Sequence, residues 1–246
     1  MWLRCRHLLP EFKPHVAKLA LACGTGIMCG GVLNRSLCTP ASTASEVTTK
    51  PSLLRKCLAE ALGVGIIIQG GCGVVCAAKY AGSAIGPGAM AIVWGASITL
   101  AVYATANISG GHLNPAVTAA LTATGKSPVE EAVPFVLAQC AGATIAAAIN
   151  YLVFSTGITA MEATQGIIRG SAASTASFAG AFGMVPNPLL VSPVGALVAE
   201  VWMTAVLVFL IFAIGDERSA VPSGAGPPLV GLSVTTLVSV FGPVTG

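Results

Sequence analysis

The sequence predicts an all-α membrane protein, and its composition, its long apolar stretches and its glycine content all indicate this class. Of the 246 residues, 54% are hydrophobic and 9% are charged, whereas roughly a quarter of the residues in a soluble globular domain carry charge. The mean hydropathy is +0.84. Apolar stretches of about twenty residues, long enough to cross a bilayer as helices, follow one another from Leu53 onward. The 29 glycines fit membrane helices, which pack closely through small side chains.

Residues 1–50 differ from the rest and are expected to form an N-terminal extension to a membrane domain over residues 51–246. Eight of the twelve Lys and Arg residues precede residue 57. The positive-inside rule explains them better than nucleic-acid binding does, and it places this end on the cytoplasmic, stromal or matrix side. The extension is basic, rich in Ser and Thr and poor in acids, which is typical of an organelle transit peptide. A disordered cytoplasmic tail fits equally well, so a plasma membrane and a plastid or mitochondrial membrane both remain open.

Five membrane-spanning helices are expected, and the order of their motifs indicates an internal repeat. The helices cover residues 57–78, 89–106, 133–154, 194–214 and 229–241. Residues 155–193, which are mostly small and polar, are expected to form a long loop. The stretch "LAEALGVGIII" from Leu58 resembles "VAEVWMTAVLV" from Val198, each with Ala-Glu early in a span. Two halves with an odd number of spans have inverted orientations, as in many transport folds.

The stretch "SGGHLNPAVTAAL", from Ser109 to Leu121, predicts a short helix within the membrane. Asn114 is a preferred N-cap, Pro115 suits the first helical turn, and Gly125 is a natural stop. About eleven residues at ~1.5 Å each span roughly half of a hydrocarbon core. Such a re-entrant helix requires an irregular approach that is buried in protein or lines a wet cavity. The alternative is an ordinary loop followed by a surface helix.

The predicted short helix has a chemistry of its own at its N-terminus. Its end carries about half a positive charge. If the Asn114 side-chain oxygen caps the helix, the amide NH₂ is left to donate into a cavity. A donor beside a positive dipole attracts neutral, oxygen-bearing solutes and repels cations, protons included.

Glu60 and Glu200 are the acids that lie well within the predicted spans. A carboxylate there costs several kcal/mol unless it faces the bundle interior and accepts hydrogen bonds. We therefore expect each glutamate to accept backbone N–H groups from a neighbouring irregular loop. The alternative is a side chain near a helix end that extends to the membrane interface.

The sequence gives no indication of a metal, a cofactor or an enzyme. None of the eight cysteines forms a Cys-x-x-Cys pair, and the three histidines are not spaced to complete a metal site. No nucleophile–base pair or pair of acids is visible. We expect neither a metal nor another cofactor.

The motif at Ser109 and its surroundings resemble the major intrinsic protein family, the aquaporins and glycerol facilitators. The resemblance extends from Leu58 to Gly246 through "LAEALG", "SGGHLNPAVTAAL", "VPNP", "VAEVWMTAVLVFLIFAIGDE" and "PPLVGLSVTTLVSVFGPVTG". It implies an aquaporin-like bundle with inverted repeats, an integral multi-pass membrane protein in contact with lipid, and assembly as a homotetramer. Glycerol, water or similar small neutral solutes are the implied partners.

The resemblance also implies which residues form the solute path and which support it. The path is implied to be lined by Trp94, His112, Asn114, Pro115, Ala116 and Val238. Its loops are implied to be supported by Glu60, Glu200, Gly110, Gly111 and Gly246. Trp94 lies at the position where glycerol facilitators typically have Trp, and Val238 is apolar where water-selective members commonly have His. A packing or interfacial role is the alternative for Trp94.

One departure from the family pattern limits what we expect of these residues. The internal repeat places a second Asn-Pro-Ala about four residues beyond Gly246. We therefore expect five transmembrane helices and one re-entrant half-helix, without the second half-helix and the sixth span of the family. The expected function is a passive channel for glycerol, water or similar solutes. A truncated, non-conducting subunit that modulates full-length relatives is the alternative. A secondary transporter is disfavoured because the spans lack a network of charges.

Overall fold

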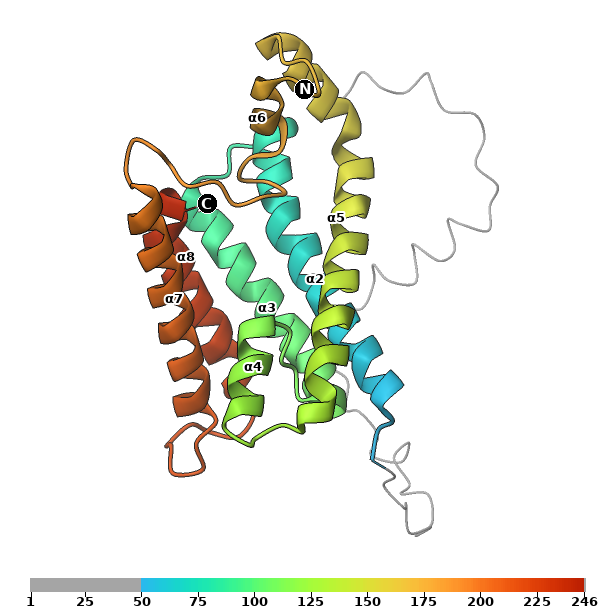
Figure 1. Cartoon of the computed structure of the whole chain (residues 1–246), viewed down its shortest axis with the longest axis vertical. Helices are drawn as coiled ribbons and strands as arrows, with labels where there is room; N and C mark the ends of the chain where they lie inside the picture. Colours follow the sequence, from blue (N-terminus) through green and yellow to red (C-terminus); the bar gives the residue numbers. More distant parts are fainter. Residues whose placement is uncertain (1–49, 246) are drawn as a thin grey trace, which may run out of the picture. The chain divides into compact units, whose positions relative to one another are not determined.

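The structure is a computed structural model that describes residues 50–245. The predicted N-terminal extension, up to residue 49, and the predicted support residue Gly246 lie outside the described residues. The described part is helical, with no β-strand (Figure 1). Its elements are α2 (Leu53–Tyr80), α3 (Pro87–Ser109), α4 (Pro115–Ala123), α5 (Val129–Gln165), η2 (Ala172–Ser174), α6 (Thr175–Phe178), α7 (Pro193–Ile214) and α8 (Gly226–Thr245).

Five of these helices, α2, α3, α5, α7 and α8, are long and apolar enough to cross a membrane. This confirms the five predicted spans and the all-helical class. The short helix α4 confirms the predicted half-helix, although it has nine residues and ends at Ala123 rather than at Gly125. Its C-cap is Thr124, whose hydroxyl donates to the Ala120 carbonyl.

The predicted loop over residues 155–193 is wrong at its start, because α5 continues to Gln165. This stretch contains no proline before Gly166, and the helix continues through Gly157 until Gly166 ends it in the left-handed region at φ 64°. The helix has 37 residues and a length of about 55 Å, so it is longer than a hydrocarbon core. Glu162, which the sequence places in the predicted loop, therefore lies on α5 near its C-terminal end.

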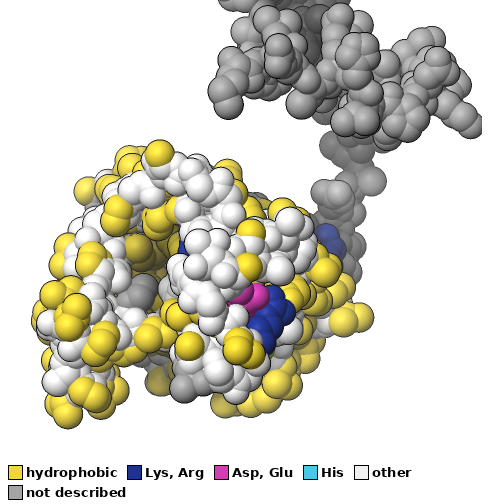
Figure 2. Space-filling view, turned by 90° about the horizontal axis from the view of Figure 1, so that it is seen from above, with side chains coloured by type: hydrophobic (Ala, Val, Ile, Leu, Met, Phe, Trp, Pro, Cys, Tyr) yellow, Lys and Arg dark blue, Asp and Glu magenta, His cyan; other side chains and the backbone are white. Residues whose placement is uncertain are grey.

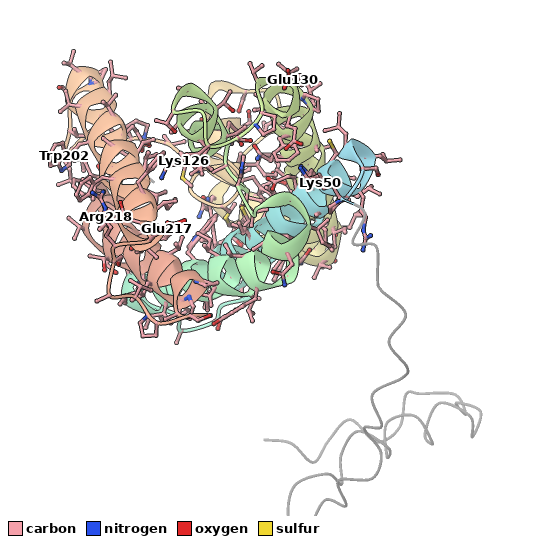
Figure 3. All side chains as sticks on the ribbon, turned by 90° about the horizontal axis from the view of Figure 1, so that it is seen from below. Lys50, Lys126, Glu130, Trp202, Glu217 and Arg218 are labelled. Atoms are coloured by element: carbon pink, nitrogen blue, oxygen red, sulfur yellow. The ribbon has the colours of Figure 1, made fainter. Side chains whose placement is uncertain are left out.

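The spanning helices follow one another in a curved row, which Figure 3 shows end-on. Helix α2 packs between α5 and α3, α3 packs against α8, and α8 packs against α7. The short α4 contacts both α5 and α7 and so lies between the two ends of the row. Hydrophobic side chains dominate the periphery (Figure 2), and the large ones include Leu54, Leu152 and Trp202. An apolar exterior of this kind suits contact with lipid.

Glycines bring the helices close together where they cross. At the α3–α8 crossing, Gly95 and Gly231 oppose each other, and a Cβ on either would lie closer than 3.0 Å to the other's carbonyl oxygen. At the α2–α5 crossing, a Cβ on Gly142 would meet the backbone of Ala61 at less than 3.0 Å. The row of helices therefore depends on backbone-to-backbone contact, the usual way in which membrane helices approach closely.

Residues 175–185, which we call the strap, are fastened to the C-terminal end of α2. The Lys79 ammonium donates to the carbonyl oxygens of Ala176 at 2.8 Å and Ala179 at 2.7 Å. The Tyr80 hydroxyl donates to the Ser177 carbonyl at 2.5 Å. The rings of Phe178 and Phe182 pack around this point. Strap and helix are thus joined by three hydrogen bonds and a small aromatic core.

Lys79→Met is expected to loosen the strap while leaving the bundle folded. The variant keeps the apolar stem but loses two hydrogen bonds from a charged donor, which should lower the local opening free energy by about 1.5 kcal/mol. Hydrogen exchange of strap amides should then be about tenfold faster, as measured by mass spectrometry. Lys50→Met is the control, because Lys50 is exposed and its side chain makes no hydrogen bond or ion pair within the described residues. Unchanged strap exchange in Lys79→Met would contradict this assignment.

Candidate functional site

A cavity of about 690 Å³ lies inside the row of helices and brings together most of the residues predicted for the solute path. Its lining comes from the four spanning helices α2, α3, α7 and α8, from α4 and the turn before it, and from the strap. The predicted residues that line it are Trp94, Gly110, Gly111, His112, Asn114, Glu200 and Val238. Pro115 is an exposed first-turn residue of α4, and Ala116 lines a groove of about 830 Å³ between α4 and α7 instead.

The turn between α3 and α4 is irregular because three of its residues have positive φ. Gly110 (φ 94°) ends α3, and Gly111 follows at φ 65°. Leu113 has φ 52°, and among the described residues it is the one non-glycine residue at positive φ. A branched side chain rarely adopts this conformation, so surrounding contacts must hold it there. Those contacts come from Glu60 and from packing of the Leu113 side chain in the core.

Glu60 is fully buried and holds this turn, as the sequence predicts. Its Oε1 accepts hydrogen bonds from the Ser109 hydroxyl at 2.6 Å and the His112 backbone N–H at 3.0 Å. Its Oε2 accepts from the Leu113 backbone N–H at 2.7 Å and from Gln139 Nε2 at 2.7 Å. The alternative, a side chain that extends to the interface, is wrong for Glu60. Four donors on two oxygens satisfy the buried group completely.

Gln139 is a support residue that the sequence reasoning missed. It is buried on α5, and its amide donates both to Glu60 and to the Thr118 hydroxyl at 3.0 Å. It thus ties α5 to α2 and to α4. An amide within a membrane span is costly unless it is paired, and this was the signal in the sequence that could have identified it.

The turn presents hydrogen-bonding groups to the cavity. Its N–H groups at Gly111, His112 and Leu113 bond to Ser109 Oγ and to Glu60. Among residues 50–245, no donor reaches the carbonyl oxygens of Gly110, Gly111 and His112, which belong to residues that line the cavity. Within the described residues, these oxygens are therefore acceptors without a partner.

Asn114 supplies the donor that the sequence predicts beside these acceptors. It caps α4, since its Oδ1 accepts from the Ala116 backbone N–H at 2.8 Å. No acceptor in the described part of the chain engages its NH₂ group, and the residue lines the cavity. The donor lies at the N-terminus of α4, where the helix dipole is positive.

The rest of the cavity lining is mainly apolar. It consists mainly of aliphatic side chains from α3 and α8 and of the half-buried Trp94. The aliphatic residues on these two helices are Ile98, Val102, Val230, Val234 and Val238. The cavity therefore combines hydrogen-bonding groups at the turn before α4 with a largely hydrocarbon lining elsewhere.

His112 and Glu200, the remaining predicted residues that line the cavity, have different surroundings. The His112 ring packs edge-on against Phe135, with centroids 5.1 Å apart, and its Nδ1 lies 3.3 Å from Thr118 Oγ1. Glu200 is exposed and lines both the cavity and the groove between α4 and α7. Nothing within residues 50–245 donates a hydrogen bond to Glu200, so its loop-holding role stays a prediction.

Comparison with known proteins agrees with this geometry. The glycerol uptake facilitator protein of Escherichia coli (strain K12) is 39% identical over 196 residues, which cover 79% of this chain and 69% of that protein. The propanediol uptake facilitator PduF of Salmonella typhimurium is 40% identical over 196 residues, covering 79% and 74%. The structure of the aquaglyceroporin from Plasmodium falciparum superposes with a TM-score of 0.67 at 23% identity, covering 79% and 75% of the two chains.

A family model described as "Major intrinsic protein" matches residues 47–246, which include every described helix. The two relatives named above are facilitators of glycerol and propanediol uptake, and the structural neighbour has the same fold. The chain is therefore an integral membrane protein that belongs to the major intrinsic protein family.

Proposed function

We propose that the chain forms a passive path for glycerol, water and similarly small neutral solutes through the cavity of about 690 Å³. The observation that carries the proposal is that this cavity combines the hydrogen-bonding groups of the turn before α4 with a largely apolar lining. A short polyol has hydroxyl groups along one edge and carbon atoms along the other, so it suits both kinds of lining as it moves along the path. The names of the facilitators of glycerol and propanediol support this class of solute.

Each wall has a distinct task in this proposal. The carbonyl oxygens of Gly110, Gly111 and His112 replace water as acceptors, and the Asn114 amide replaces it as a donor. Trp94 and Val238 contact the carbon atoms of the solute further along the path. The positive end of α4 disfavours cations, protons included, next to Asn114.

Stopped-flow light scattering of proteoliposomes that contain the purified chain tests this proposal. Glycerol and water permeability are expected to exceed those of protein-free liposomes, without any increase in proton leak. Water permeability without glycerol permeability would overturn the polyol assignment. Neither permeability would overturn conduction by this chain.

Modulation of a conducting relative is a second candidate function, which the exposure of α7 favours. Within the described structure, Ala196 is the one buried residue of α7. Trp202 points away from the other helices in Figure 3. Such a surface suits another subunit, whether a second copy in the proposed homotetramer or a relative. Co-reconstitution with a conducting facilitator should change that facilitator's permeability if this function is the main one.

A further inference from the structure

Helix α2 turns a regular stripe of four residues toward the cavity, and two of them have no side chain. Gly63, Ile67, Gly71 and Val75 recur at intervals of four and therefore share one face. Ile67 and Val75 line the cavity directly. The places of the two glycines are occupied by side chains from elsewhere. A Cβ on Gly63 would lie closer than 3.0 Å to Leu113, and one on Gly71 would lie closer than 3.0 Å to Trp94.

The contact at Gly71 involves the indole ring itself. The nearest atoms to a Cβ there are Cδ2, Cε3 and Cζ3 of Trp94, all closer than 3.0 Å. The same ring lines the cavity between Ile67 and Val75 and packs against the buried cluster of Val64, Ile67, Ala101 and Leu113. A rigid ring with a packed neighbour behind it has one direction in which to move, which is into the open cavity.

We propose that Gly71 is a specificity-determining positioning residue, which sets the width of the solute path by leaving room for the Trp94 ring against α2. This inference rests on the proposed function, because it assigns the selectivity of that same path. A methyl group at position 71 displaces the indole into the cavity. Water still passes the narrower path, whereas a polyol with a carbon backbone does not fit.

Gly71→Ala is expected to lower the ratio of glycerol to water permeability about tenfold, since a methyl-sized change in a fitted apolar site alters discrimination by that much. The matched control is Gly65→Ala on the same helix. There the nearest atom to a new Cβ is the Gly142 carbonyl oxygen at 3.8 Å, an ordinary contact. The ratio in this control should stay at the parent value.

The double variant Gly71→Ala with Trp94→Phe distinguishes positioning from general damage. A phenyl ring is smaller than an indole, so the ratio should return toward the parent value when both changes are present. If Gly71→Ala alone does not fold, recovery of folding in the double variant supports the proposal. A double variant that is as impaired as the single one overturns it.

Fluorescence provides a readout that does not depend on transport. Replacing Trp2 and Trp202 by Phe leaves Trp94 as the single tryptophan of the three in the chain. In this background, Gly71→Ala should raise the quenching of Trp94 by acrylamide, a small neutral quencher, whereas Gly65→Ala should not. If Gly71→Ala raises the quenching of Trp94 but the parent does not conduct glycerol, the proposed function is wrong and the position of the ring against Gly71 is supported. If the parent conducts glycerol but Gly71→Ala changes neither the ratio of glycerol to water permeability nor the quenching of Trp94, the inference is wrong.

Discussion

Glu60→Gln is expected to lower solute permeability at least about tenfold and to cost about 3 kcal/mol of stability. The carboxylate accepts from four donors, two of them backbone N–H groups of the turn before α4. Glutamine keeps one acceptor oxygen and places an NH₂ group against the remaining donors. If the NH₂ group takes the place of Oε2, Leu113 loses the bond that holds its positive φ and Gln139 loses its link to α2. If it takes the place of Oε1, the Ser109 hydroxyl and the His112 backbone N–H lose their acceptor. In both cases the carbonyl wall of the cavity loses its fixed geometry.

Permeability and thermal unfolding in detergent together test this expectation. Glu130→Gln is the matched control, because Glu130 is exposed in the first turn of α5 and no described residue bonds to its side chain (Figure 3). Glu60→Asp keeps both acceptor oxygens on a shorter stem, so its effect should be intermediate. If Glu60→Gln kept the parent's permeability and midpoint, the turn would be held by other contacts, and the role assigned to Glu60 would be wrong.

The buried role of Glu60 and the cap at Asn114 could be predicted from sequence because each depends on a local rule. A carboxylate inside an apolar span must find donors, and an Asn-Pro pair begins a helix. The five spans follow from hydropathy in the same way. None of these predictions required knowledge of which helices are neighbours.

The features that the sequence did not predict depend on neighbours in space or on weak local signals. Gln139 reaches Glu60 across 79 positions of the chain, and Trp94 covers Gly71 only because α2 and α3 pack side by side. The end of α5 was missed for a local reason. Small and polar residues form a helix readily when packing supports it, and Gly157 of α5 lies against Tyr80 of α2.

Gly142→Val is expected to prevent folding of the bundle, and Gly142→Ala to destabilise it by about 3 kcal/mol. The atoms closest to a Cβ at this position are the oxygen, carbonyl carbon and Cα of Ala61, all nearer than 3.0 Å. They belong to the backbone of α2, so no side-chain rotation relieves the contact. The helices would have to separate at the crossing, with loss of the packing on both sides of it.

Gly65→Ala is the control across the same crossing, since a Cβ there lies 3.8 Å from the Gly142 carbonyl oxygen. It should unfold at or slightly above the parent's midpoint, because alanine is the better helix former. Thermal unfolding of both variants in one detergent measures the contrast, and equal midpoints would contradict the crossing described here.

The Gly142→Ala variant also tests how packing and transport are connected. Ala61 directly follows Glu60, so moving α2 away from α5 at this point carries the carboxylate away from Gln139 and from the turn. Folded Gly142→Ala protein should therefore lose permeability to glycerol and to water together. Gly71→Ala, by contrast, should reduce glycerol alone, because it moves a side chain of the apolar wall and leaves the carbonyl wall in place. If both variants changed the ratio of the two solutes equally, the separation of the cavity into a supporting wall and a selecting wall would be wrong.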